Sequence, residues 1–320
     1  MDLRAEALAA AERIRGHVRQ TPVERSAHLE AVTGGRVYLK LENYQLTGSF
    51  KLRGAMNALL SLTREQRSRG VVAASSGNHG AAVACGAAQV GCRAAVFVPH
   101  GAQPSKLAMI RAWGAEVREV GEDCVEAEAA ARRYAADHGL SYVSPYNDER
   151  VVAGQATVGV ELARQVGRID AVFVSLGGGG LISGTGGYLK AVAETEVIAC
   201  SPENSRVMHA SLEVGRLLEM PSLPTLSDGT AGGVEAGAIT FELCRKVVDD
   251  SLLVSEAEIA AAMRLILAHQ HMLIEGAAGV AVAGVVRTAE RWRDRNVAIV
   301  LCGANVGIDV LTTVLSPGNR

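Results

Sequence analysis

The chain has 320 residues, of which 48% are hydrophobic, and its formal net charge at pH 7 is -2. A chain of this length and composition buries a large core and forms either two domains or one large domain. Positive and negative side chains nearly balance, so the chain lacks the excess positive charge that binds nucleic acids. No apolar run approaches the roughly 20 residues of a membrane span. We therefore expect a cytoplasmic globular protein that binds a small molecule, and neither a nucleic acid nor a membrane.

Helical and strand-like segments follow one another along the chain. Residues 1–16 have helical spacing, and residues 37–41 alternate like a strand. The predicted segments that follow are strand 71–75, helix 80–90, strand 94–98, helix 105–113, strand 116–120, helices 125–138 and 151–166, strand 171–175, helix 182–192, strand 196–200, a loop at 220–224, helices 239–248, 256–271 and 278–293, and strand 298–301. The pattern predicts an α/β fold with two sheets, the first formed around residues 71–138.

Glycine-rich turns follow four of the strand-like segments. Lys51 lies in the first turn, and the other three have the sequences SSGNHG (75–80), GGGG (177–180) and CGAN (302–305). In open α/β sheets, ligands bind outside the carboxyl ends of the strands, where such turns converge. The sequence therefore predicts that the four turns share one binding site.

Lys51 is the strongest candidate for chemistry. A lysine held in a tight Gly/Ser/Phe setting loses its proton more readily than a free one, and a neutral amine forms a Schiff base with an aldehyde. Taken alone, the Lys-Leu-Arg run at 51–53 is equally typical of the start of a solvated helix. The three other glycine-rich turns that are predicted to lie at the same site favour the catalytic interpretation of Lys51.

The four consecutive glycines at 177–180 favour an anion site. In glycines no side chain blocks the backbone N–H groups, so several of them can converge on a phosphate at a helix start. A tight turn that binds nothing would carry the conformational-entropy cost of four glycines without any compensating interaction. A dinucleotide motif is excluded because Ile182 occupies its last glycine position, and no P-loop sequence occurs.

The turn at 75–80 carries the chemistry of a carboxylate-binding loop. It combines two serine hydroxyls, the Asn78 amide and backbone N–H groups at a predicted helix start, although serines there also serve as ordinary helix caps. His79 is a possible base, but no carboxylate lies at triad-like spacing, so an orienting or internally hydrogen-bonded histidine is favoured.

Cys302 follows the last predicted strand and points to the same crevice. Its thiol is a candidate nucleophile, a small buried residue or a weak hydrogen-bond partner. The six cysteines form no C-x-x-C pair, so we expect reduced, buried thiols and no structural zinc. His269 and His271 lie on different helix faces and suit no shared metal.

Together these motifs resemble the fold-type II pyridoxal-phosphate enzymes, and within them the threonine/serine dehydratase and serine racemase branch. The resemblance rests on residues 49–54, 75–80, 177–180 and 302–303, with further matching stretches at 152–155, 228–229 and 273–275. His79 separates the chain from the cysteine synthase branch. The resemblance implies a tryptophan synthase β-like fold of open, twisted, mostly parallel sheets flanked by helices. It also implies a large cofactor-binding domain (1–60 and 148–320) and a small mobile domain (61–147).

The resemblance also implies a role for each site residue. Lys51 would hold pyridoxal phosphate covalently and remove the substrate's α-proton, with Phe50 beside the ring. Asn78 would donate to the phenolic oxygen, and Cys302 would face the pyridine nitrogen. The phosphate would be held by Gly177, Gly178, Gly179, Gly180 and Leu181, and the substrate carboxylate by Ser75, Ser76, Gly77, Asn78 and His79.

The implied activity is β-elimination, in a homodimer, of a β-hydroxy amino acid such as L-threonine or L-serine to a 2-oxo acid and ammonia. One alternative is a racemase that uses Lys51 and Ser76 on opposite ring faces. Another is a dehydratase for 3-hydroxyaspartate, phenylserine or a hydroxyectoine-pathway compound, and a third is a non-catalytic binding protein. Racemase-like members bind a divalent cation through carboxylates where this chain has Ser201 and Val207, so we expect no metal.

Overall fold

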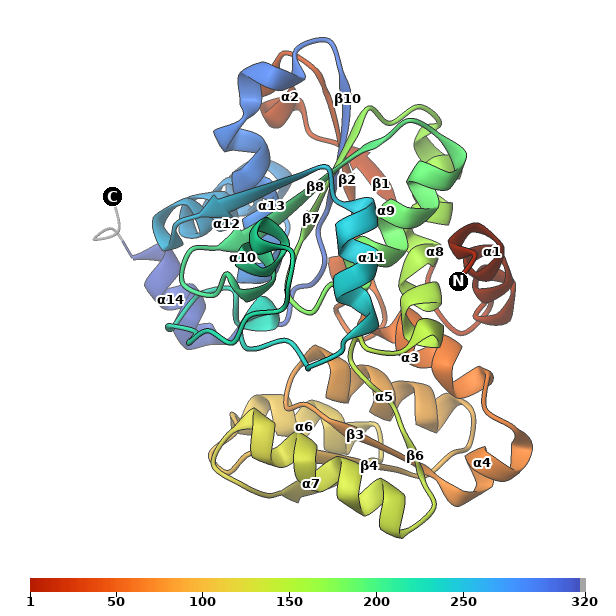
Figure 1. The fold of residues 1–320 in the computed structure, drawn as a ribbon. Coiled ribbons are helices and arrows are strands. Elements are labelled where there is room, and N and C mark those ends of the chain that lie inside the picture. The colour runs from red at the N-terminus through yellow and green to blue at the C-terminus, as the bar shows by residue number, and fades with distance from the viewer. Residues whose placement is uncertain (317–320) are drawn as a thin grey trace.

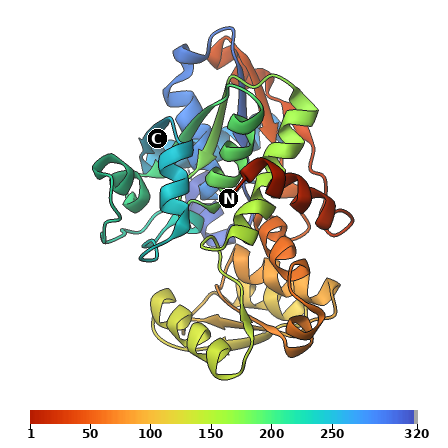
Figure 2. The same cartoon turned by 45° about the vertical axis from the view of Figure 1, so that its right-hand side comes forward.

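The computed structural model describes residues 1–316 and contains two separate sheets. Figure 1 and Figure 2 show the sheets at opposite ends of the molecule, each covered by helices. The sequence-based expectation of an α/β fold with open, mostly parallel sheets is confirmed. The division into a large and a small mobile domain stays a prediction.

The larger sheet has six strands in the order β1-β2-β10-β7-β8-β9. Only β1 runs antiparallel to its neighbour, and the other pairs are parallel. The strands are β1 (Val23–Arg25), β2 (Arg36–Lys40), β10 (Asn296–Val300), β7 (Ala171–Ser175), β8 (Glu196–Pro202) and β9 (Asp250–Val254). Its central strands are buried on both faces, as expected for a parallel sheet.

The smaller sheet has four parallel strands in the order β5-β4-β3-β6. They are β5 (Glu116–Glu119), β4 (Ala94–Val98), β3 (Val71–Ala74) and β6 (Ser141–Tyr142). Alternate side chains of β4 face opposite sides: Val96 and Val98 pack against α5 and α6, while Ala95 and Phe97 pack against α7. Helices therefore cover both faces of this sheet too.

Helices fill the remaining chain. They are α1 (Leu3–Arg13), α2 (Ala27–Thr33), α3 (Lys51–Leu60), α4 (Arg64–Arg69), α5 (Asn78–Gln89), α6 (Pro104–Ala112), α7 (Cys124–Asp137), α8 (Glu149–Val166), α9 (Gly180–Val192), α10 (Val207–Val214), α11 (Ile239–Val247), α12 (Glu256–Gln270), α13 (Gly276–Arg287) and α14 (Ile308–Leu315), with 3-10 turns η1 (Glu42–Tyr44), η2 (Asp228–Thr230) and η3 (Ala289–Trp292). Within residues 1–316, none of these helices is long and apolar enough to cross a bilayer.

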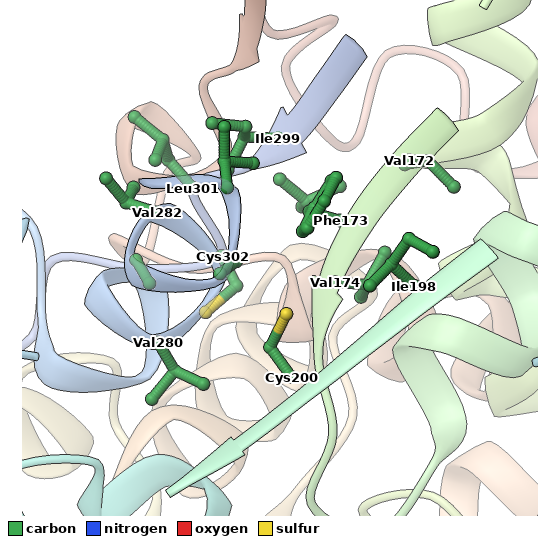
Figure 3. Packing of buried hydrophobic residues seen from close by; sticks show 14 of the residues in the cluster. Val172, Phe173, Val174, Ile198, Cys200, Val280, Val282, Ile299, Leu301 and Cys302 are labelled. Carbon is green, nitrogen blue, oxygen red and sulfur yellow. The ribbon is translucent and has the colours of Figure 1, made fainter. Parts of the chain in front are cut away.

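Side chains of three central strands and α13 interlock in the core of the larger sheet. Figure 3 shows Val280 and Val282 of α13 beside residues of β7, β8 and β10. Helix α13 approaches closely because Gly284 faces the strands: a Cβ there would lie 2.5 Å from the Cys200 sulfur. This packing fixes the carboxyl ends of β7 and β10, which carry two of the predicted site turns.

Glycines let three helices near the site pack backbone to backbone. A Cβ on Gly154 of α8 would lie 2.5 Å from the Arg53 carbonyl oxygen of α3. A Cβ on Gly184 of α9 would lie 2.5 Å from the Val152 carbonyl oxygen of α8. Helix α8 therefore joins α3, which begins with Lys51, to α9, which begins at the glycine turn.

Several predicted details are wrong. The helix expected at 278–293 ends at Arg287, because Thr288 receives a hydrogen bond from the Trp292 indole and the chain turns to bury that ring against Phe173. Strands β1, β6 and β9 and helix α10 were not predicted. Cys124 is exposed at the start of α7, whereas the other five cysteines are buried as expected.

Candidate active site

A cavity of about 520 Å³ opens between the two parts of the molecule that contain the sheets. The carboxyl ends of β3, β7 and β10 and the start of α3 contribute its walls. Every predicted site residue lines it: Phe50, Lys51, Ser75, Ser76, Gly77, Asn78, His79, Gly177, Gly178, Gly179, Gly180, Leu181 and Cys302. The four predicted turns therefore meet in one cavity, while ligand binding there and the role of each residue stay predictions.

Lys51 is the first residue of α3, and its amine faces the cavity. Its Nζ donates to the Pro145 carbonyl oxygen at 3.0 Å and lies 5.3 Å from the centre of the Phe50 ring. Burial lowers the pKa of Lys51 to about 8, although Cys302 and Glu275 oppose this effect. A useful fraction of the amine is therefore neutral, and nucleophilic, near physiological pH.

A buried charged cluster anchors the helix that carries Lys51. The Arg53 guanidinium, two residues further along α3, donates to both carboxylate oxygens of Glu42 at 2.8 Å and to Glu161 at 2.6 and 2.9 Å. Lys40 of β2 donates to the same Glu161. Arg53, Glu42 and Lys40 are fully buried, and their ion pairs with one another and with Glu161 tie α3 to β2 and α8.

The glycine turn between β7 and α9 leaves no room for side chains. A Cβ on Gly178 would lie 2.3 Å from the Tyr146 ring, and one on Gly177 would lie 2.9 Å from Thr230. Gly179 has φ +84°, in the left-handed region that favours glycine. Helix α9 begins without a side-chain cap, so its first N–H groups are open to an anion.

We expect Gly178→Ala to weaken this turn. The added methyl group overlaps the Tyr146 ring, so the turn or the ring must shift, at a cost of about 1–3 kcal/mol in stability. Cofactor retention should fall with it. The measurement is the thermal midpoint and the phosphate-containing cofactor retained after dialysis. Gly233→Ala is the matched control, because that glycine lines the same cavity with nothing within 4 Å of its Cβ position. Equal behaviour of the two variants would contradict the prediction.

The turn at 75–79 presents hydroxyls and N–H groups to the cavity. Gly77 precedes α5, and its N–H donates to the Ser75 hydroxyl at 3.1 Å. His79 is buried, and its Nε2 lies 2.8 Å from the Val143 carbonyl oxygen. Burial lowers the pKa of His79 to about 3, so the ring is neutral and Nε2–H donates to the carbonyl. His79 is thus an internally hydrogen-bonded histidine and not a base.

Cys302 lies at the end of β10 with its thiol in the cavity wall. The Ser175 hydroxyl donates to its sulfur at 3.5 Å. Burial raises the pKa of Cys302, and the carboxylate of Glu275 adds to the effect, so the residue stays a neutral thiol. This environment disfavours the nucleophile among the three interpretations of Cys302.

Glu275 and Asn305 are two cavity residues that sequence reasoning left without a role. Glu275 precedes α13 but does not cap it; both of its carboxylate oxygens accept from the Asn78 amide nitrogen, at 2.9 and 3.0 Å. The Asn305 backbone N–H donates to Glu275 at 3.0 Å. The signal in the sequence was a single acidic residue within the apolar, small-residue run 272–283.

Two ion pairs connect the helices of the smaller sheet to the loop between α10 and α11. Lys106 of α6 lies 2.7 Å from Asp228, and Arg132 of α7 lies 2.9 Å from Glu235. The Glu235 backbone N–H also donates to the Tyr146 hydroxyl at 2.9 Å. These contacts join the two parts of the molecule at the cavity. In the described chain, no group of three or more His, Cys, Asp or Glu residues suits a metal ion.

Comparison with known proteins agrees with this geometry. The family described as pyridoxal-phosphate dependent enzymes matches residues 14–303. An L-threonine ammonia-lyase of Thermotoga maritima is 41% identical over 94% of this chain and 75% of its own length. A beta-hydroxyaspartate dehydratase of Paracoccus denitrificans is 36% identical over 95% of this chain and 96% of its own. The structure of maize serine racemase has a TM-score of 0.92 at 30% identity, covering 97% and 95% of the two chains.

The family match over residues 14–303 shows that the chain belongs to the pyridoxal-phosphate dependent enzymes, and the two mostly parallel sheets, the desolvated lysine and the side-chain-free glycine turn in one cavity agree with that class. Within it, the chain is a fold-type II ammonia-lyase of the threonine/serine dehydratase branch. The residues present fit the cofactor: the Lys51 amine suits its aldehyde, and the cradle at Gly177–Gly180 that any Cβ would fill suits its phosphate.

Proposed function

We propose that this ammonia-lyase converts L-threonine or L-serine to the corresponding 2-oxo acid and ammonia. The observation that carries the proposal is the desolvated Lys51 amine in the same cavity as the 75–79 turn and the open start of α9. These three features supply a nucleophile and base, a carboxylate site and a phosphate site. The amino-acid class of substrate agrees with the relatives, and the side chain is the proposed part.

Each role follows from the chemistry of the chain's own residues. The bound cofactor supplies an electron sink for the electrons released at the substrate's α-carbon. Lys51 would hold the cofactor through Nζ, and the same amine would take the α-proton of the substrate. Ser75, Ser76 and the N–H groups of the 75–79 turn orient the carboxylate. The neutral Cys302 thiol offers no carboxylate to stabilise a charged ring nitrogen, which suits elimination better than transamination.

A racemase is the second candidate, because Ser76 lines the same cavity as Lys51 and the maize relative is a serine racemase. An acidic substrate such as 3-hydroxyaspartate ranks lower. Lys106 is a cation on the cavity wall, but Asp228 at 2.7 Å already neutralises it. Glu275 adds a further negative group to the walls, which disfavours a second substrate carboxylate.

Closure of the smaller sheet over bound substrate and assembly as a homodimer are also proposed. Substrate carboxylate bound at the 75–79 turn would bridge the two sheets. The ion pairs Lys106–Asp228 and Arg132–Glu235 already join the two parts across the cavity, and they would hold a closed arrangement that excludes water from the reacting atoms.

The decisive experiment measures 2-oxo acid and ammonia release by the holoenzyme from L-threonine, L-serine, L-threo-3-hydroxyaspartate and phenylserine. The enantiomeric composition of the remaining substrate is measured in parallel. Highest kcat/KM for threonine or serine, with oxo acid and ammonia in equal amounts, supports the proposal. Enantiomer exchange without oxo acid would replace it with racemisation, and a preference for another substrate would change the assigned side chain.

A further inference from the structure

Hydrogen bonds link three side chains of the cavity wall, those of Asn305, Asn78 and Glu275, and they fix the orientation of both side-chain amides. The Asn305 side-chain nitrogen donates to the Thr47 backbone carbonyl at 2.8 Å and also to the Asn78 side-chain oxygen. A carbonyl oxygen only accepts, so the Asn305 amide cannot be reversed. The Asn78 oxygen must therefore face Asn305, and its NH2 group must face Glu275, whose two oxygens accept from it.

Hydrogen bonds also fix the position of Glu275. The Glu275 backbone N–H donates to the Gly303 carbonyl at 3.0 Å, and the Glu275 Oε2 accepts from the Asn305 backbone N–H at 3.0 Å. A Cβ on Gly303 would lie 2.7 Å from the carboxylate, so glycine is required beside it. The side chain is 2% exposed. Burying a carboxylate costs free energy, and the Glu275 side chain does not offset this cost by capping its own helix. Its contacts with Asn78 therefore indicate a function there.

We propose that Glu275 is a positioning residue that acts through Asn78. By accepting from the NH2 group, the carboxylate keeps the amide turned so that its second N–H remains a donor toward the cofactor. This inference rests on the proposed function, through the predicted contact between Asn78 and the cofactor's phenolic oxygen. Glu275 itself touches neither substrate nor cofactor in this proposal.

The charge of Glu275 is poised to change near neutral pH. Burial raises the pKa of Glu275 to about 7, opposed by the hydrogen bonds from Asn78 and Asn305. The ionised form accepts from the Asn78 nitrogen through both oxygens, from the Asn305 N–H and, at 4.0 Å, from the Cys302 thiol, whereas a protonated oxygen becomes a donor and opposes one of these contacts. The hold on Asn78 is therefore strongest above pH 7. The other charged or titratable groups facing this region are Asp228, Lys106, Lys51 and Cys302.

The test is Glu275→Gln in the holoenzyme. A glutamine accepts through one atom only, so its NH2 group must oppose either Asn78 or the Asn305 N–H. We expect cofactor release after dilution to be about tenfold faster, as for loss of a hydrogen bond to a charged group. We also expect the wild-type cofactor absorption spectrum to show a step near pH 7 between pH 5.5 and 9, which the variant lacks.

Two further variants keep the test decisive. Glu128→Gln removes the same charge from the same cavity, but Glu128 contacts Arg132 at 2.8 Å instead of Asn78, so it should retain the release rate and the spectral step. Asn305→Ala removes the contact to the Asn78 side-chain oxygen but leaves both contacts from the Asn78 nitrogen to Glu275, so it should keep the spectral step. Near-UV circular dichroism verifies that each variant is folded.

An unchanged release rate or spectral step in folded Glu275→Gln, or a wild type without the step, overturns the proposal. If Glu275→Gln does not fold, a wild-type cofactor release rate that does not rise as the pH falls through 7 overturns it instead. None of these readouts uses an amino-acid substrate. A wild type that shows the predicted cofactor behaviour but forms no oxo acid would therefore overturn the proposed function alone.

Discussion

Lys51→Ala is expected to lower 2-oxo acid release at least about 10³-fold, since one substitution removes both the covalent attachment of the cofactor and the base for the α-proton. Among residues 1–316, the other amine and imidazole that line the cavity are already engaged: His79 is held neutral by burial and is bonded to a backbone carbonyl, and the Lys106 amine is paired with Asp228. The variant should also lack the visible absorption of the covalently held cofactor.

The measurement combines the absorption spectrum, before and after borohydride reduction, with oxo acid release from L-threonine and L-serine. Lys190→Ala is the control, because Lys190 pairs with Asp249 at the protein surface and should behave as wild type. A reducible visible band that persists in Lys51→Ala would place the attachment on another amine and contradict the assignment.

Arg53→Met is expected to lower the free energy of unfolding by about 3–5 kcal/mol, the usual cost of removing one partner from a buried ion pair. Burial opposes ionisation of Glu42, but the Arg53 guanidinium outweighs this and holds the pKa of Glu42 below its usual value. Without the guanidinium, the fully buried Glu42 carboxylate keeps only the hydrogen bond from Thr21 and the attraction of Lys40. It must then protonate or draw water into the core.

Urea unfolding at pH 7 measures the change. The control is Arg245→Met, whose partner Glu242 is exposed, and we expect a change below about 1 kcal/mol there. A loss in Arg53→Met no greater than in this control would show that the cluster contributes specificity and not stability. The loss should shrink as the pH falls, because protonation relieves the unpaired carboxyl group.

The parallel core of the fold could be predicted because its strands are apolar runs that end in glycine turns. Residues 171–175 are predicted and found as β7, and 94–98 as β4. The strands that escaped prediction depend on partners distant in the chain. Strand β1 has three residues, two of them charged, and exists because it pairs with β2 at the sheet edge. Tertiary context overrides local propensity in such cases.

The same limit applies to the site. Lys51 and the glycine turns carry their chemistry in local spacing, so the sequence indicated them. Glu275 and Asn305 acquire their function from Asn78, about 200 residues earlier in the chain, and no local pattern encodes that contact. Tyr146 was missed for a related reason: its ring matters because it occupies the space that a side chain at Gly178 would fill.

The glycine contacts of α8 have a consequence for how the cofactor is received. The two anchoring points proposed for it, the Lys51 amine and the start of α9, lie on helices whose backbones pack closely against the same third helix at Gly154 and Gly184. Fixing a loose residue costs about 1–2 kcal/mol of conformational entropy, and here that cost is met during folding. The span between the amine and the phosphate cradle is thus preorganised, so binding energy goes into holding the cofactor instead of assembling its site.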